Sequence, residues 1–183
     1  MKTVKWLLGT AGRGAGKGVV SEVGVGGAAG GRPGAAARIA AGAAAVGLAA
    51  AGAFHAVWVF SPWPLASRAE YAAVVVGVTE AQLPSGPLTT AVAGLLVAAS
   101  WLVVTGARPG HPLAGSRLVR AGLWTVAGVL AVRGAGGLLV SALGLGEVPE
   151  EFRRWDLVLY SPLCVALGGL TAYLALRTRP GRA

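Results

Sequence analysis

Four long apolar runs alternate with shorter polar stretches along the 183-residue chain, and they cover residues 39–60, 88–106, 118–143 and 157–176. An α-helix rises about 1.5 Å per residue, so about 20 apolar residues cross a hydrocarbon core roughly 30 Å thick. Each run is about that long. Only helices satisfy their own backbone hydrogen bonds within lipid, whereas a membrane β-strand needs only about ten alternating residues. The pattern therefore predicts an all-α integral membrane protein, a four-helix bundle.

The polar ends of the chain divide it into three parts. Residues 1–38 are basic and rich in glycine, and they contain no apolar stretch long enough for the core of a signal peptide. We expect residues 1–38 to form a flexible cytoplasmic tail, residues 39–177 to form the four-span transmembrane domain, and residues 178–183 to form a second cytoplasmic tail.

The basic residues predict the orientation of the bundle. Twelve of the sixteen lysines and arginines fall on the flank that carries both ends of the chain and the loop between the second and third runs. The opposite flank has only Arg68, Arg153 and Arg154, together with six of the seven acidic residues. Because cytoplasmic loops carry an excess of Lys and Arg, we expect both ends in the cytoplasm, an N-in/C-in topology.

Composition agrees with a membrane protein, because 55% of the residues are hydrophobic and only 13% are charged. Heavy use of Ala, Gly, Val and Arg is typical of GC-rich bacterial coding, so the expected location is a bacterial inner membrane. A net charge of +9 would suggest nucleic acid as the partner of a soluble protein. Here the anionic lipids of the inner leaflet explain the same charges, so the expected partner is the lipid bilayer, and no nucleic acid is expected.

The longest loop on the outer flank covers residues 61–87 and begins and ends with proline-rich turns. Within it, residues 71–78 are apolar but too few to cross a membrane. We expect a surface helix or a strand-like segment there. Trp58, Trp63 and Trp155 lie near this face, as in an interfacial aromatic belt.

Arg133 is the most informative single residue, because it lies near the middle of the third run. A charge at that depth costs about 3 kcal/mol, and an arginine strains to reach either surface by extending its side chain. We therefore expect Arg133 to face the bundle and to have a partner. Gly134, Gly136 and Gly137 beside it would let a neighbouring helix or a ligand approach closely.

The topology brings further polar residues into the outer half of the bundle. His55, Arg133, Asp156 and Tyr160 could converge there as an anion-binding or proton-handling site, with Trp58 one turn beyond His55. The plainer alternatives are a hydrogen-bonded core histidine at His55, an N-cap at Asp156, and a purely structural pairing of Arg133 with Asp156 or with backbone carbonyls.

The sequence points to no cofactor or metal. The second histidine, His111, lies on the opposite flank, which argues against a bis-histidine haem. The single cysteine excludes an intramolecular disulfide. Residues 24–29 match G-x-G-x-x-A, but no strand precedes them and no acidic residue follows at the required distance, so we attribute the match to the abundance of glycine.

Three segments carry a resemblance: residues 54–58 (Phe-His-Ala-Val-Trp), 132–137 (Val-Arg-Gly-Ala-Gly-Gly) and 152–164, which contain Phe-Arg-Arg-Trp-Asp and Tyr-Ser-Pro-Leu-Cys. Over residues 38–177 they resemble a family of small bacterial membrane proteins, domain of unknown function 3995. The sequence departs from that family's pattern after Trp58, where residues 60–62 replace a stretch that usually contains glycine. The resemblance implies a four-helix membrane fold and supplies no activity. It places these candidate residues at recognisable positions: His55, Trp58, Arg133, Asp156 and Tyr160.

Two functions follow from these expectations. The polar cluster could bind a small or lipid-like molecule, with an anionic or proton-exchanging group. Alternatively, the polar residues fix helix packing in an accessory subunit, whose Ala/Gly faces dock a membrane partner or a second copy of the chain. A transporter ranks below both, because four spans are few and no inverted repeat is visible. No catalytic motif is recognisable in the sequence.

Overall fold

The structure is a computed structural model, and it describes residues 34–178. Within that range the chain is entirely helical and contains no strand. The expected tails fall outside it, apart from residues 34–38 and Thr178, as does the G-x-G-x-x-A match. The elements in chain order are α1 (Ala35–Phe60), α2 (Arg68–Tyr71), η1 (Ala72–Val76), η2 (Glu80–Gln82), α3 (Gly86–Ala107), α4 (Arg117–Leu143), α5 (Glu150–Trp155), η3 (Asp156–Tyr160) and α6 (Ser161–Arg177).

Four helices are long and apolar enough to cross a membrane: α1, α3, α4 and the continuous run Glu150–Arg177, which joins α5, η3 and α6. These four correspond to the four apolar runs of the sequence. Their surfaces are apolar as well, since Ile39, Leu95 and Val132 are 71%, 71% and 76% exposed. A helix that is apolar on its exposed side is typical of a membrane span or of a larger assembly.

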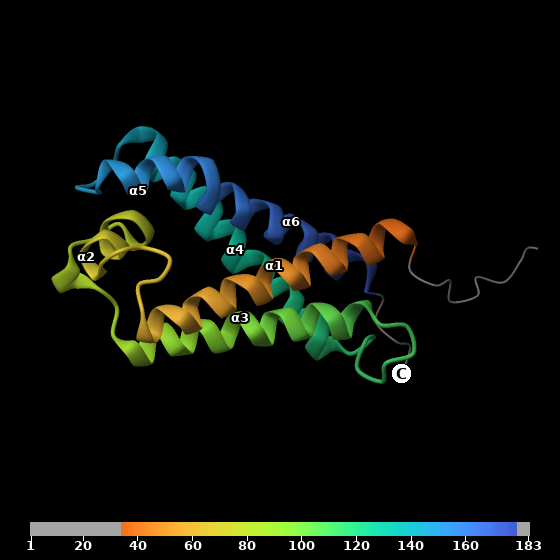
Figure 1. The fold of residues 1–183 in the computed structure, drawn as a ribbon. Helices are drawn as coiled ribbons and strands as arrows, with labels where there is room; N and C mark the ends of the chain where they lie inside the picture. The colour runs from red at the N-terminus through yellow and green to blue at the C-terminus, as the bar shows by residue number, and fades with distance from the viewer. Residues whose placement is uncertain (1–33, 179–183) are drawn as a thin grey trace, which may run out of the picture. The chain divides into compact units, whose positions relative to one another are not determined.

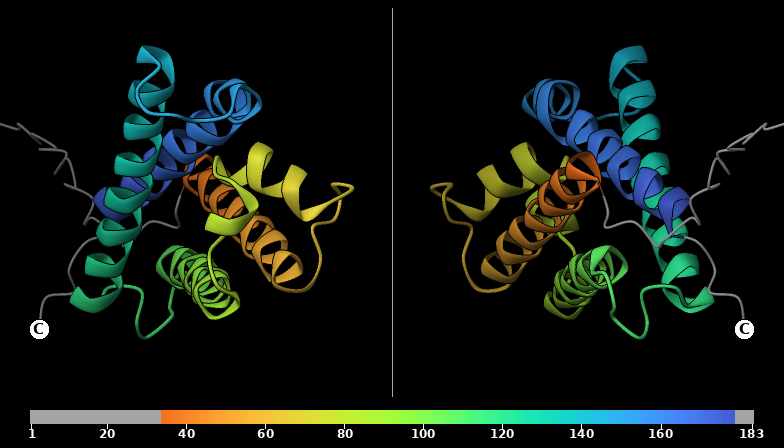
Figure 2. Two further views of the ribbon diagram at one scale, coloured as in Figure 1. Left: turned by 90° about the vertical axis from the view of Figure 1, so that its left-hand side faces the viewer. Right: turned by 90° about the vertical axis from the view of Figure 1, so that its right-hand side faces the viewer.

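The four long helices form two pairs, because α1 packs along α3 and α4 packs along α6. The pairs contact each other less extensively, chiefly through α1 with α6 and α3 with α4. In Figure 1 they lie close together where α1 begins and are farther apart at the end that carries α2 and α5, and Figure 2 shows the same two pairs along another direction. The shared core contains large side chains from every long helix: Leu48, Val103, Val119, Leu123, Leu167 and Leu174.

Small residues bring the helices of each pair together. A Cβ at Gly52 of α1 would lie 3.3 Å from the carbonyl oxygen of Ala93 in α3, and a Cβ at Gly168 of α6 would lie 3.3 Å from that of Ala127 in α4. The Ser100 hydroxyl adds a hydrogen bond across the first pair by donating to the Ala45 carbonyl at 2.9 Å. Close approach of backbones at small residues is the usual basis of helix packing in lipid.

The helix boundaries differ from the expected ones in two places. α1 begins at Ala35, so part of the expected tail is helical. The fourth long helix begins at Glu150 rather than at 157, with Glu150 and Glu151 in its first turn. Acidic side chains interrupt an apolar run, but they favour the first turn of a helix, where the backbone N–H groups carry partial positive charge. Asp156 is therefore not a helix N-cap, because Pro149 occupies that position and Asp156 lies well inside the helix.

The outer-loop segment is helical rather than strand-like. α2 begins at the N-cap Ser67, whose hydroxyl accepts from the Glu70 backbone N–H, and it continues into the wider turn of η1. Gly77 ends this segment with a φ of 80°, which other residues adopt with strain. There Gly77 packs against the ring of Phe152 in α5. The outer loop is thereby attached to the start of the fourth long helix.

Candidate functional site

Arg133 of α4 pairs with Asp156 of η3. The Arg133 Nη2 donates to Asp156 Oδ1 at 2.9 Å, and its Nη1 donates to the Ser161 hydroxyl at 3.3 Å. This is the only ion pair in residues 34–178. It joins the third and fourth long helices, and it gives Arg133 the partner that its position within an apolar run requires.

Two serines complete the coordination of Asp156. The Ser141 hydroxyl donates to Asp156 Oδ2 at 2.7 Å, and the Ser161 hydroxyl donates to the same oxygen at 2.9 Å. Asp156 is completely buried. Ser161 thus accepts from Arg133 while donating to Asp156, which uses both capacities of one hydroxyl group. Asp156 receives three side-chain hydrogen bonds, as a buried carboxylate needs.

The wide helical turn of η3 aligns Asp156 with Ser161. The two residues are five apart, which in a regular α-helix places them about 140° apart around the axis. Here the Ser161 backbone N–H donates to the Asp156 carbonyl, closing a turn of i→i+5 type. Such π-turns recur at functional sites, because they change which side chains share a face.

Two of the three neighbouring glycines make room for this network. A Cβ at Gly137 would collide with Ser161 Oγ and Arg133 Nη1. One at Gly134 would lie 2.9 Å from the Ser161 carbonyl oxygen. Gly136 faces open space. Gly134 and Gly137 therefore permit the approach of a neighbouring helix that the sequence indicated, and Gly136 has no part in it.

The guanidinium of Arg133 is only partly engaged. Its side chain is 44% exposed, whereas that of Asp156 is 1% exposed. A guanidinium has five N–H donors, and only two bonds to side chains form here. Both serines bond to Asp156 Oδ2, so Arg133 reaches only Oδ1 and the parallel two-bond geometry usual for an arginine–carboxylate pair does not form. The remaining N–H donors of Arg133 form no hydrogen bond within residues 34–178.

His55 and Trp58 lie in a separate aromatic group at the end of α1. His55 Nδ1 is 2.8 Å from the Ala51 carbonyl oxygen, a contact within its own helix. The Trp58 ring lies 5.1 Å from the His55 ring and 5.3 Å from the Tyr71 ring, and its indole N–H donates to the Trp63 carbonyl. No hydrogen bond or ion pair of residues 34–178 joins His55 or Trp58 to Arg133 or Asp156.

Tyr71 of α2 adds a buried phenol ring to this aromatic group. Burial raises the pKa of Tyr71 above its usual range, and the cation of Arg68 opposes that rise. The neutral phenol is thus the stable form where the Tyr71 ring meets the Trp58 ring.

Tyr160 occupies a third position. Its hydroxyl donates to the Val74 carbonyl of η1 at 3.3 Å, and its ring lies 6.1 Å from that of Phe152. Tyr160 therefore attaches the outer-loop segment to the fourth long helix. Of the five candidate residues, the structure brings Arg133 and Asp156 into direct contact and gives the other three different neighbours.

Sequence reasoning did not assign a role to Ser141 or Ser161. A lone serine in an apolar helix usually bonds to the carbonyl four residues earlier, so nothing in the pattern marked either one as a carboxylate partner. The sequence analysis included Ser161 only as part of the Tyr-Ser-Pro-Leu element of the family resemblance, without a role of its own. No group of three or more His, Cys, Asp or Glu residues in the described range is arranged to hold a metal ion.

Among known proteins, this chain resembles one family. Neither the curated proteins nor the solved structures contain a match to this chain. One family does match, over residues 48–171, which is more than half of the chain and includes every residue of the network. The chain belongs to the family described as Protein of unknown function (DUF3995).

Proposed function

We propose that this chain is a multi-pass protein of the bacterial inner membrane, with both ends in the cytoplasm, that binds the anionic group of a small or lipid-like molecule at Arg133. The four long apolar helices, their exposed apolar side chains and the segregation of basic residues support the membrane part of the proposal.

The partly exposed side chain of Arg133, whose guanidinium forms only two hydrogen bonds, is the observation that carries the binding part. A residue with only a packing role would be paired on all sides, because each unsatisfied N–H in an apolar medium is unfavourable. Asp156 is satisfied in that way, and Arg133 is not. An anionic oxygen could accept from the free N–H groups without displacing Asp156.

The depth of Arg133 favours a ligand with an apolar part. Arg133 lies ten residues before the end of α4 at Leu143, which corresponds to about 15 Å along the helix. Its face of α4 also carries Gly122 and Val126, which pack against Leu102 and the core. The Arg133 side chain itself is 44% exposed. A ligand reaching it through the bundle or from the lipid must enter hydrocarbon, which a lipid-like molecule does readily.

The second candidate function is that of an accessory subunit in which the network only fixes the packing of α4 against α6. The complete burial of Asp156 and its three donors favour this role. The two candidates differ in what happens when both charges are removed together. Replacing a buried ion pair by uncharged side chains often leaves stability unchanged, whereas a binding site for an anion is lost.

The test compares the detergent-solubilised chain with the double variant Arg133→Leu/Asp156→Asn, and uses Arg154→Leu, an exposed outer arginine, as the matched control. The melting temperature is measured with inorganic phosphate, with a short-chain phosphatidylglycerol and with a short-chain phosphatidylcholine. We expect the anionic lipid to raise the melting temperature of the chain and of Arg154→Leu more than that of the double variant. The phosphate arm separates a free anion from a lipid head group.

A second variant, Asp156→Asn, removes only the counter-charge of Arg133. It should enlarge the response to the anionic probe, because the guanidinium is then free to bind an external oxygen. If every variant responds to the probes as the unmodified chain does, Arg133 binds no anion and the accessory role remains.

A further inference from the structure

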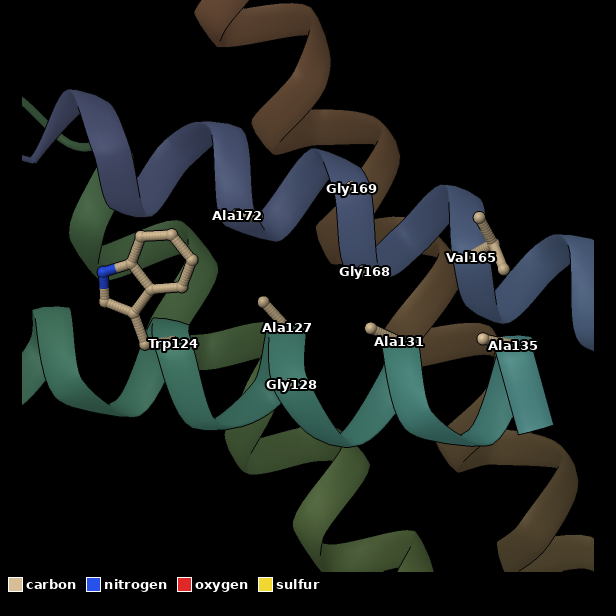
Figure 3. Close-up of a pocket in the computed structure, with 9 residues that line it drawn as sticks. All are labelled: Trp124, Ala127, Gly128, Ala131, Ala135, Val165, Gly168, Gly169 and Ala172. Carbon is tan, nitrogen blue, oxygen red and sulfur yellow. The ribbon is translucent and has the colours of Figure 1, made fainter.

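A second feature, an apolar groove, lies along the contact between α4 and α6 and away from the Arg133 network. A groove of about 380 Å³ runs between these helices and is lined entirely by apolar side chains and glycines. Trp124 lies at one end, and Ala135 and Val165 lie at the other, as Figure 3 shows. None of the residues of the Arg133 network lines it.

Two glycines of this groove are not required by helix packing. A Cβ at Gly168 would lie 3.2 Å from the Cβ of Leu130, so that glycine permits the helices to approach. A Cβ at Gly128 or Gly169 would meet nothing within 4 Å. The small size of Gly128 and Gly169 therefore leaves space open on the groove instead of bringing the two helices together.

The groove leads to two arginines on the same face of α4. Arg117, Arg120, Trp124, Gly128, Ala131 and Ala135 follow one another at intervals of three or four residues, which places them on one side of a helix. Arg117 and Arg120 belong to the first turn of α4, where the backbone N–H groups add partial positive charge and no acidic side chain is present. Neither arginine forms an ion pair within residues 34–178.

The dimensions of the groove match one leaflet of a membrane. Trp124 and Ala135 are eleven residues apart in α4, which corresponds to about 16 Å along the axis, or roughly half of a hydrocarbon core about 30 Å thick. An apolar groove of that length, open to one side and with two unpaired arginines beyond Trp124 on the same helix face, fits an acyl chain beneath an anionic head group. Basic pockets between helices on the cytoplasmic side commonly bind such lipids.

We infer that the groove between α4 and α6 binds one anionic phospholipid of the cytoplasmic leaflet, with the acyl chain against Gly128 and Gly169 and the phosphate near Arg117 and Arg120. This inference rests on the membrane orientation proposed above and is independent of ligand binding at Arg133. Arg117 and Arg120 favour a lipid over a second copy of the chain as the occupant. In a second copy, the acidic residues of the described range all lie on the opposite flank and would not reach these two arginines.

Native mass spectrometry of the full chain, released from detergent with equal amounts of phosphatidylglycerol and phosphatidylcholine, tests the inference. We expect phosphatidylglycerol to remain bound in preference to phosphatidylcholine. The variant Arg117→Gln/Arg120→Gln should weaken that binding by about fivefold for each arginine removed. Arg108→Gln, an exposed arginine on the same flank but after α3, is the matched control and should change nothing.

Two further variants test where the acyl chain binds. Gly128→Leu and Gly169→Leu fill open space and raise helix propensity, so both should fold, and both should reduce retention of either lipid. Equal retention of the two lipids, or retention unaffected by the arginine and leucine variants, overturns the inference. So does a dimer that Gly128→Leu separates, since the occupant is then a second chain. The variants at Arg117 and Arg133 are separate, so either proposal can fail while the other stands.

Discussion

At the scale of single residues, the two members of the Arg133–Asp156 pair are enclosed to different extents. Asp156 is enclosed by Ser141, Ser161 and the guanidinium, whereas the Arg133 side chain is 44% exposed. Charged groups within an apolar run persist only where hydrogen bonds and an opposite charge compensate the loss of water. The compensation is complete for the acid and partial for the base, and the proposed binding at Arg133 rests on this inequality.

The glycines beside Arg133 provide a prediction at this scale. Gly137→Ala should lower the free energy of unfolding by about 1–3 kcal/mol, because its Cβ would displace Ser161 and Arg133 from their hydrogen bonds. Gly136→Ala is the matched control, and should be neutral or slightly stabilising, because its Cβ meets nothing and alanine favours the helix. Unfolding of both variants in mixed micelles by a denaturing detergent measures the difference. Equal stabilities would mean that Gly137 is not packed against the network.

At the scale of elements, the fourth long helix has two tasks. Its apolar part packs along α4, and its first turns hold the outer loop through Phe152 and Tyr160. The wide turn of η3 lies between these parts and turns Asp156 and Ser161 towards α4. A regular helix through residues 156–160 would separate those two side chains, so the local geometry of one turn determines whether the network forms.

The attachment of the outer loop gives a prediction for η1 and α5. Gly77→Ala places a Cβ about 3 Å from the Phe152 ring and forces a left-handed backbone on alanine, which costs about 1–2 kcal/mol before any clash. Gly110→Ala has nearly the same φ but meets no neighbour, so it isolates the backbone effect. We expect hydrogen exchange in residues 68–82 to accelerate in Gly77→Ala and to stay unchanged there in Gly110→Ala. Unchanged exchange in both variants would contradict the attachment.

At the scale of the whole molecule, the four apolar helices bury few large side chains against one another and expose many. A protein with such surfaces needs an apolar environment, since water around contiguous hydrophobic patches is unfavourable. The exposed apolar faces of the two helix pairs are therefore compatible with a surrounding bilayer.

The proposed orientation predicts the outcome of reporter fusions. Alkaline phosphatase, which is active only after export, should be active when fused after Gln82 or Glu147 and inactive when fused after Gly110 or Thr178. Green fluorescent protein at the same positions should give the opposite pattern, because it fluoresces only when it folds in the cytoplasm. Export of the fusion after Thr178 would reverse the expected orientation and would also remove the cytoplasmic leaflet from Arg117 and Arg120.

The sequence alone determined the number and approximate extent of the four long helices, because the length and composition of an apolar run are local properties. It also indicated the family and singled out Arg133 as a residue that requires a partner. It placed the start of the fourth helix too late, because hydropathy does not register amphipathic first turns such as that of Glu150.

Tertiary structure alone decided which polar side chains meet. Arg133 lies 23 residues from Asp156, and Ser141 lies 15 residues from it, so their contacts depend on how α4 crosses the fourth helix and on the wide turn at η3. Neither the crossing of the two helices nor the wide turn of η3 is encoded in a local pattern of apolar and polar positions. For the same reason the open groove beside Gly128 could be found only in three dimensions, since glycine that permits contact and glycine that leaves space look identical in a sequence.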